Sequence, residues 1–291
     1  MNLHSLIIRT LTGVIYVLLL VGCTIYSPVS AFFFFAIITA ATLWEFGSLM
    51  NAHVHSQMVR PVNSMAGVVL VAAVWLSTIA NPQTAQTFAL FGLLLIYIIV
   101  SELYRHSKNP LRNWALCFAS QIYVALPFAL LPLLSIGFNA ETGELVYSWI
   151  YPLALFIFLW VNDTFAYLCG CSLQKFFPAK LFPSISPKKS WIGSIGGAIF
   201  TLVAAVLIWW AVGSQCSMFN VQCSMSLWRW IGFAVVVIFF GTWGDLVESL
   251  IKRQLDIKDS GKILPGHGGL LDRFDSALLA IPASVIYFVL T

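Results

Sequence analysis

Long apolar runs separated by short polar segments make up most of this chain. The hydrocarbon core of a bilayer is about 30 Å thick and takes roughly 20 apolar residues per helix. Irregular backbone is not tolerated against lipid, so the pattern predicts an all-α, polytopic integral membrane protein with about nine transmembrane helices. We place the runs at about 6–26, 29–50, 64–81, 86–104, 113–136, 147–169, 192–213, 227–248 and 274–291.

Composition agrees with this fold class. The 291 residues are 60% hydrophobic and only 9% charged, whereas soluble domains carry about 25% charged residues. The first run lacks a small-residue cleavage site before a soluble domain, so we interpret it as a retained helix. We divide the chain into 1–140, a scaffold of about five helices that also gives lipid access, and 141–291, whose helices carry the site. No nucleic-acid partner is expected.

The distribution of positive charge predicts the orientation, because Lys and Arg collect on the cytoplasmic side of membrane proteins. With a cytoplasmic N-terminus, every cation except Arg229 falls in an inner segment. The polar segment 252–275 is then cytoplasmic as well. The inner cations are Arg9, Arg60, Arg105, Lys108, Arg112, Lys175, Lys180, Lys188, Lys189, Lys252, Arg253, Lys258, Lys262 and Arg273.

Polar residues are scarce before residue 140. Glu45 and Glu102 lie near cytoplasmic ends of apolar runs. Intramembrane carboxylates are functional candidates, but here we favour a structural role, at the interface or paired with Arg. Pro127 and Pro132 predict a kinked fifth helix.

Cysteines do not indicate a metal site. Cys23, Cys117 and Cys169 lie in apolar runs and are expected to be small core residues. Cys216 and Cys223 share the loop assigned outside, where either a disulfide or two free thiols would fit.

The polar chemistry concentrates in three segments after residue 160, at 161–167, 184–197 and 244–275. One site built from all three is the economical inference. In 244–253 the spacing puts Asp245, Glu248, Ser249 and Lys252 on one helical face. The alternative is a solvated helix end with pairing between residues four apart.

A second pair of acids, Asp272 and Asp275, stands at the start of the last apolar run. Isolated buried carboxylates are costly, so clustered acids near a membrane surface favour a bound cation. Oxygen ligands alone favour Mg²⁺. Capping of the helix by Asp272 is the structural alternative.

Cations and glycines near the acids are typical of a binding site for anions such as phosphate. Lys252, Arg253, Lys258 and Lys262 neutralise anions, and Gly266, Gly268 and Gly269 allow close approach of backbone N–H groups. The segment SPKKS before Gly193, Gly196 and Gly197 is a second favourable place for phosphates, although a basic loop on anionic lipid would look the same. His267 is either a general base or a positioning residue. Acids beside phosphate-binding bases predict phosphoryl or nucleotidyl transfer.

The segments SLIKR (249–253), KDSG (258–261) and PGHGGLLDRFD (265–275) together resemble the signature of phosphatidate cytidylyltransferases, also called CDP-diacylglycerol synthases. NDT (162–164), AY (166–167) and SPKKS (186–190) extend the resemblance over the C-terminal half. The chain departs from the family pattern at Ile192, where the family has Glu or Gln, and at Gln174, where it tends to have Gly.

The resemblance implies condensation of CTP with phosphatidic acid to give CDP-diacylglycerol and pyrophosphate. It implies an Mg²⁺ centre, with K⁺ beside it, held by the residues that match the family's acids: Asp245, Asp272 and Asp275. Lys252, Arg253 and His267 complete the candidate catalytic set. The candidate substrate-binding residues are Asn162, Asp163, Ser186, Lys188, Lys189, Ser190, Ser249, Lys258, Asp259, Gly268, Gly269 and Arg273.

Further expectations concern the setting. We expect a bacterial inner membrane, a site that faces the cytoplasm, contact with membrane lipids and a homodimer, as the family resemblance suggests. Two alternatives stay open: a cytidylyltransferase for another lipid phosphate, such as an isoprenoid ether lipid, and an ion-coupled transporter whose acids carry cations.

Overall fold

Helices long enough to cross a membrane make up most of the protein. The structure is a computed structural model and describes residues 3–138, 143–173, 175, 178–214, 225–261, 263–264, 266 and 268–291. Within these residues, eight helices are long and apolar enough to span a bilayer, and the first helix adds a shorter apolar stretch, Thr10–Tyr26. The predicted all-α, polytopic membrane protein with about nine spans is confirmed.

Packing divides the chain into two compact units. The first comprises Met1–Gly137 and Gln254–Phe274, and the second comprises Phe138–Arg253 and Asp275–Thr291. The sequence suggested a simple division near residue 140, whereas in the structure the segment that follows Arg253 packs with the N-terminal helices. The polar segment 252–275 is therefore shared between the two units.

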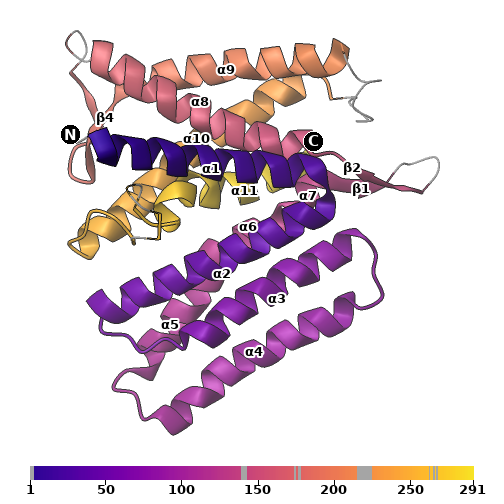
Figure 1. The fold of residues 1–291 in the computed structure, drawn as a ribbon, viewed down its shortest axis with the longest axis vertical. Helices are drawn as coiled ribbons and strands as arrows, with labels where there is room; N and C mark the ends of the chain where they lie inside the picture. Colours follow the sequence, from indigo (N-terminus) through magenta and orange to yellow (C-terminus); the bar gives the residue numbers. More distant parts are fainter. Residues whose placement is uncertain are drawn as a thin grey trace. The chain divides into compact units, whose positions relative to one another are not determined.

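The first unit is built on neighbouring long helices, of which α2, α3 and α4 lie side by side (Figure 1). The last span of this unit is interrupted at Leu131, just before Pro132, whereas α6 continues through Pro127. The kink expected at these prolines stays a prediction. The elements are α1 (Leu3–Tyr26), α2 (Pro28–His53), α3 (Arg60–Thr78), α4 (Thr84–Arg105), α5 (Pro110–Ser120), the π-helical turn η1 (Gln121–Ala125), α6 (Leu126–Leu130) and α7 (Pro132–Ser135).

The connections that precede and follow α8 (Ile150–Leu173) form two short pairs of strands. The elements are β1 (Ile136–Phe138), β2 (Leu145–Tyr147), α8 (Ile150–Leu173), β3 (Lys180–Phe182), β4 (Ser186–Ser190), α9 (Trp191–Ser214), α10 (Leu227–Gln254) and α11 (Leu271–Leu290). β3 and β4 pair as an antiparallel hairpin, with Lys180 opposite Ser190.

Glycines at the start of α9 let this helix approach α8 closely, and the two run side by side in Figure 1. A Cβ atom on Gly196 would overlap the Cys169 side chain, and one on Gly197 would lie 2.6 Å from the Asn162 carbonyl oxygen. Small residues at such crossings are typical of membrane helices. These glycines therefore serve helix packing, and the phosphate binding expected of this segment stays a prediction.

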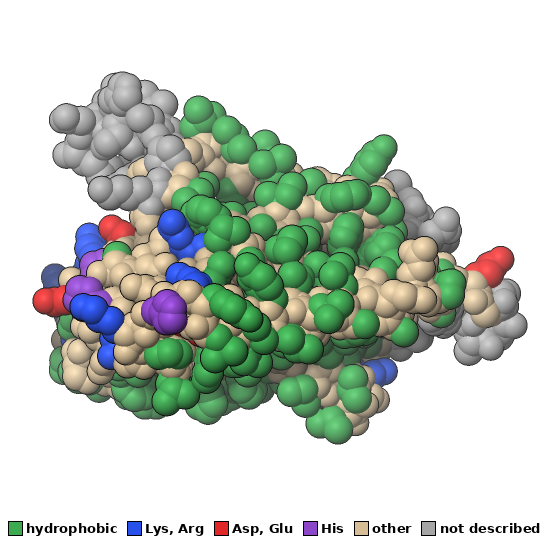
Figure 2. Space-filling model, turned by 90° about the horizontal axis from the view of Figure 1, so that it is seen from below, with side chains coloured by type: hydrophobic (Ala, Val, Ile, Leu, Met, Phe, Trp, Pro, Cys, Tyr) green, Lys and Arg blue, Asp and Glu red, His purple; other side chains and the backbone are tan. Residues whose placement is uncertain are grey.

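Apolar side chains are also abundant on the outside of the protein. On the face seen in Figure 2, hydrophobic side chains cover the middle, while Lys, Arg and His side chains gather at one end. On α4, Leu93 is 61% exposed and Leu103 is 69% exposed. Extended apolar surface of this kind is rare on soluble monomers, and here the lipid bilayer is the solvent that accommodates it.

Arg105 and Arg112, two cations of the first unit, lie together at one end of it. Arg105 donates to the Gln57 carbonyl oxygen at 2.7 Å, and Arg112 donates to the Val54 carbonyl oxygen at 2.7 Å. The loop after α2 and the loop after α4 therefore meet at one end of the unit. The cytoplasmic location of this end stays a prediction.

Arg229, the one cation assigned outside, lies near the start of α10, whereas Lys252 lies near its end. A rise of 1.5 Å per residue separates them by roughly 35 Å, which is enough to cross the hydrocarbon core. This separation agrees with the predicted alternation of charge.

The close α8–α9 packing generates a prediction. Gly197→Ala should lower the free energy of unfolding by about 1–3 kcal/mol, the usual cost of overpacking, because the new methyl group meets the α8 backbone. Gly92→Ala in α4 is the matched control, since nothing lies within 4 Å of the position that its methyl group would occupy, and it should be neutral or stabilising by up to about 1 kcal/mol. Thermal unfolding in detergent measures both, and equal midpoints would contradict the packing role.

Candidate active site

Asp245, on α10 of the second unit, is held by two side chains. The Lys189 Nζ atom lies 2.7 Å from its Oδ2 atom, and the Ser249 hydroxyl donates to its Oδ1 atom at 3.1 Å. Lys189 also reaches the Thr242 carbonyl oxygen at 3.4 Å. The hairpin β3–β4 thus delivers a lysine to the acidic face of α10, as a site built from both segments requires.

Two further acids belong to the same electrostatic cluster. Asp163 on α8 interacts with Asp245 and Lys189, and Asp275 on α11 interacts with Asp245, Asp163 and Lys252. The second unit therefore brings together acids from α8, α10 and α11. Because like charges repel one another, the cluster is stabilised by the neighbouring Lys189 and Lys252.

Lys252 has its own acidic partner, since it forms an ion pair with Glu248 one turn earlier on α10. Glu248 is fully buried. The alternative interpretation of this face, pairing between residues four apart, is therefore correct for both Asp245–Ser249 and Glu248–Lys252. Its description as a solvated helix end is wrong, because these groups are buried or half-buried.

The SPKKS segment forms strand β4 and leads directly into α9. Ser190 is buried and accepts a hydrogen bond from the Gly193 N–H at 3.3 Å, which caps the helix. Lys188 is exposed, whereas Lys189 turns toward Asp245. The Arg253 Nε atom donates to the Ile185 carbonyl oxygen at 3.3 Å, so the hairpin is also tied to the end of α10.

Asn162 is buried on α8, and its Oδ1 atom faces the close approach of Gly197. Within the described residues this oxygen has no hydrogen-bond partner. A buried amide oxygen without a partner costs free energy. The role of Asn162 in substrate binding stays a prediction.

In the first unit, Asp272 organises the glycine-rich segment before α11. Its Oδ2 atom accepts hydrogen bonds from the Ser260 N–H at 2.9 Å and from the Gly269 N–H at 2.8 Å. Gly268 has a φ of +83°, and a Cβ atom there would lie 2.6 Å from Asp272 Oδ2. Both donors precede α11, so these bonds do not show the capping alternative for Asp272, and its role as a metal ligand stays a prediction.

Glu45, on α2, contacts the same glycine-rich segment, and its sequence position alone did not indicate this importance. The carboxylate is 5% exposed and accepts hydrogen bonds from the Ser260 hydroxyl at 2.5 Å, the Leu270 N–H at 2.9 Å and the Leu271 N–H at 3.1 Å. The expected pairing of Glu45 with an arginine is not what the structure shows, because its carboxylate binds a hydroxyl and two backbone N–H groups of the glycine-rich segment. An acid inside an apolar run was the available signal, and nothing near it in the sequence pointed to its distant partners.

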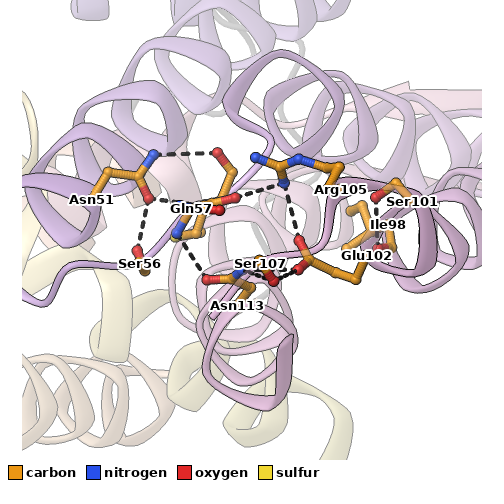
Figure 3. Close-up of polar contacts among 10 residues, drawn as sticks. Asn51, Ser56, Gln57, Ile98, Ser101, Glu102, Arg105, Ser107 and Asn113 are labelled. Atoms are coloured by element: carbon orange, nitrogen blue, oxygen red, sulfur yellow. Dashed lines mark hydrogen bonds and ion pairs between the residues drawn. The ribbon is translucent and has the colours of Figure 1, made fainter. Parts of the chain in front are cut away.

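Glu102 occupies a different polar network, shown in Figure 3. Its Oε1 atom lies 3.0 Å from Arg105 Nη1, and its Oε2 atom accepts from Ser107 and from Asn113 Nδ2, the latter at 3.0 Å. Asn113 in turn accepts from the Gln57 N–H at 2.8 Å. The structural role expected for Glu102 is confirmed, and its network joins the loops after α2 and α4.

Other candidate residues fall outside these clusters. Lys258, Asp259 and Arg273 are exposed, and Ser186 lies opposite Phe182 in the hairpin. The predictions made for Lys262, His267, Gln174, Cys216 and Cys223 lie outside the described residues.

The donor types in these clusters fit a magnesium ion, because carboxylate oxygens are its preferred protein ligands. Asp245 and Asp275 belong to the second unit, and Asp272 belongs to the first. Among the described residues, no three His, Cys, Asp or Glu side chains are grouped closely enough to hold one metal ion. The metal assignment therefore stays a prediction.

Comparison with known proteins gives a consistent result over the whole chain. A sequence model described as the cytidylyltransferase family matches residues 7–291. A protein of Staphylococcus aureus (strain COL) named phosphatidate cytidylyltransferase is 34% identical over 281 residues, which cover 94% of this chain and 96% of the relative. A protein of the same name from Staphylococcus epidermidis is 32% identical over 290 residues, 98% of this chain and 99% of the relative.

The acid cluster of the second unit generates a stability prediction. Lys189→Ala should destabilise the protein because it leaves Asp163 and Asp245 without this cation. Adding Asp245→Asn should restore part of the loss, with a coupling free energy of about 1 kcal/mol that shrinks as salt is raised. Thermal unfolding of both single variants and the double variant measures the coupling. Lys188→Ala is the exposed control, and strictly additive effects would contradict the cluster.

Proposed function

Because the chain belongs to the cytidylyltransferase family, we propose that it transfers the cytidylyl group of CTP to phosphatidate, giving CDP-diacylglycerol for phospholipid biosynthesis. An oxygen of the phosphatidate phosphate attacks the α-phosphorus of CTP, the bond between the α-phosphorus and the bridging oxygen breaks, and pyrophosphate leaves. The observation that carries this proposal is the cluster of Asp163, Asp245, Asp275, Lys189 and Lys252 in an otherwise apolar unit.

Charge determines what the chain's own residues must do. A phosphomonoester has a second pKa of about 6, so the attacking oxygen is already anionic near neutral pH and needs little help from a general base. The main barrier is the approach of two anions. Lys189, Lys252 and Arg253 lower this repulsion and orient the phosphates, while Ser190 and the β3–β4 hairpin hold the lysine-bearing strand in place.

We further propose that Asp245, Asp272 and Asp275 hold Mg²⁺, with K⁺ beside it. When bound, Mg²⁺ supplies neutralisation of phosphate charge. The donor chemistry supports this proposal, and the family resemblance implies the same ligands.

The protein is an integral membrane protein, and we propose that it lies in a bacterial inner membrane with its site facing the cytoplasm. The alternation of cations supports this orientation. The acyl chains of the lipid then stay in the bilayer while its phosphate meets CTP at the surface. A homodimer is proposed from the family resemblance, and the mass of the purified protein in detergent tests it.

The activity is tested by incubating purified protein with labelled CTP, Mg²⁺ and a panel of lipid phosphates. We expect a lipid-soluble cytidine product with phosphatidic acid. A product formed only with an isoprenoid ether lipid phosphate would replace the proposed substrate. No product with any lipid phosphate would contradict nucleotidyl transfer and favour ion transport.

The role of Asp275 generates a further prediction. Asp275→Asn should lower kcat by about a hundredfold or more while the protein stays folded, because the acid cluster loses a charge at the proposed metal centre. Asp256→Asn is the matched control: Asp256 is an exposed acid with a φ of +57°, a conformation that Asn also tolerates, and kcat should be unchanged. Near-normal turnover by Asp275→Asn across a range of Mg²⁺ concentrations would contradict the assignment.

A further inference from the structure

Glu45 lies more than 200 residues before the glycine-rich segment in the sequence, yet it accepts three hydrogen bonds from residues at the two ends of that segment. We propose that Glu45 is a positioning residue for the reaction: it fixes the start of α11, and through it the placement of Asp272 and Asp275. The inference rests on the proposed function for its catalytic consequence. Its structural part is independent of that function.

The contacts of Glu45 are those of a cap contributed by a distant helix. The first N–H groups of an α-helix have no partner within the helix, and the helix dipole favours a negative charge at this end. The Leu270 N–H donates to Glu45 Oε2, and the Leu271 N–H donates to Oε1. The carboxylate thus satisfies two backbone groups that start α11 and are buried away from water.

Two glycines leave room for this carboxylate. A Cβ atom on Gly261 would lie 2.6 Å from Glu45 Oε2, and one on Gly269 would overlap Oε1. Any side chain at either position would displace Glu45 or the segment. Gly269 was expected to admit a substrate anion, and in this structure the anion that it admits is a carboxylate of the protein.

Asp272 holds the same glycine-rich segment as Glu45. Ser260 donates its hydroxyl to Glu45 and its N–H to Asp272, while Gly269 donates its N–H to Asp272 and packs against Glu45. The carboxylates of Glu45 and Asp272 therefore both contact Ser260, at one end of the glycine-rich segment, and Gly269, at the other end. Because Asp272 is itself a proposed metal ligand, a shift of this attachment moves a reacting group.

Glu45 and the glycine-rich segment each depend on the other, because the carboxylate is buried. A buried carboxylate is costly unless it is fully hydrogen-bonded, so Glu45 stabilises the segment only in the position that supplies all three donors. Phe274, one turn into α11, is fully buried and packs edge-on against Tyr16 and Phe128 in the same unit. Apolar packing and the Glu45 contacts thus fix the same end of the helix.

Glu45→Gln is the sharpest test because it keeps the shape of the side chain. The two backbone N–H groups donate to different oxygens of Glu45 and cannot reverse, so an amide with a single carbonyl oxygen leaves one of them facing an NH₂ group. We expect faster hydrogen exchange at the Leu270 and Leu271 amides. We also expect kcat to fall by about a hundredfold, as for a small misplacement of reacting groups, with KM for phosphatidate little changed.

Glu102→Gln is the matched control. Glu102 is an equally buried acid of the same unit, 5% exposed, that accepts hydrogen bonds on both oxygens but holds the loops after α2 and α4 (Figure 3). This variant should leave exchange at Leu270 and Leu271 and the value of kcat close to wild type. Glu45→Asp, which keeps the charge on a shorter side chain, should have a kcat between those of wild type and Glu45→Gln.

Three results would overturn the inference: a kcat within twofold of wild type in Glu45→Gln, unchanged exchange at Leu270 and Leu271, or equal losses of kcat in both Gln variants at equal loss of thermal stability. If Glu45→Gln does not fold, Ser260→Ala removes only one donor and should still lower kcat, and a normal kcat there would contradict the proposal. An inactive wild-type protein would overturn the proposed function instead, while the exchange measurement would still decide whether Glu45 holds the segment.

Discussion

The cost of placing a carboxylate in an apolar protein governs the arrangement of this molecule. Three acids near the polar segment have specific partners: Asp245 has Lys189, Glu248 has Lys252, and Glu45 has the start of α11. Without such partners these carboxylates would be costly to bury. Because each partner comes from another element or another turn, each of these three acids also fixes one part of the chain against another.

Close helix approach is the second constraint, and it depends on glycine. A Cβ atom on Gly244 of α10 would lie 2.6 Å from the Asp275 carbonyl oxygen, and one on Gly197 of α9 would lie at the same distance from the Asn162 carbonyl oxygen. In lipid there is little hydrophobic drive to hold helices together, so such packing carries much of the association energy. Gly244 thereby sets how near Asp245 and Asp275 can lie in the second unit.

Hydropathy and charge were sufficient to predict the fold class, because the bilayer imposes its thickness on every span. The residue types of the acid cluster were also predictable, since Asp245 and Lys189 lie in polar segments of an apolar chain. Two features were not. In the sequence, Gly196 and Gly197 have the same pattern whether they bind phosphate or allow α8 to pack closely. The partners of Glu45 are far away in the sequence. Single-sequence patterns report what lies within one element, whereas these contacts join elements.

The course of the chain through the two units gives the polar segment its importance. Ser249 and Arg253 belong to the second unit, the glycine-rich part belongs to the first, and the chain returns to the second at Asp275. Asp272 and Asp275 are nevertheless one turn apart on a single helix, α11. A helix transmits the position of its first turn to the next with a fixed rise and rotation. Whatever holds the start of α11 therefore also sets the direction in which this helix continues toward Asp275.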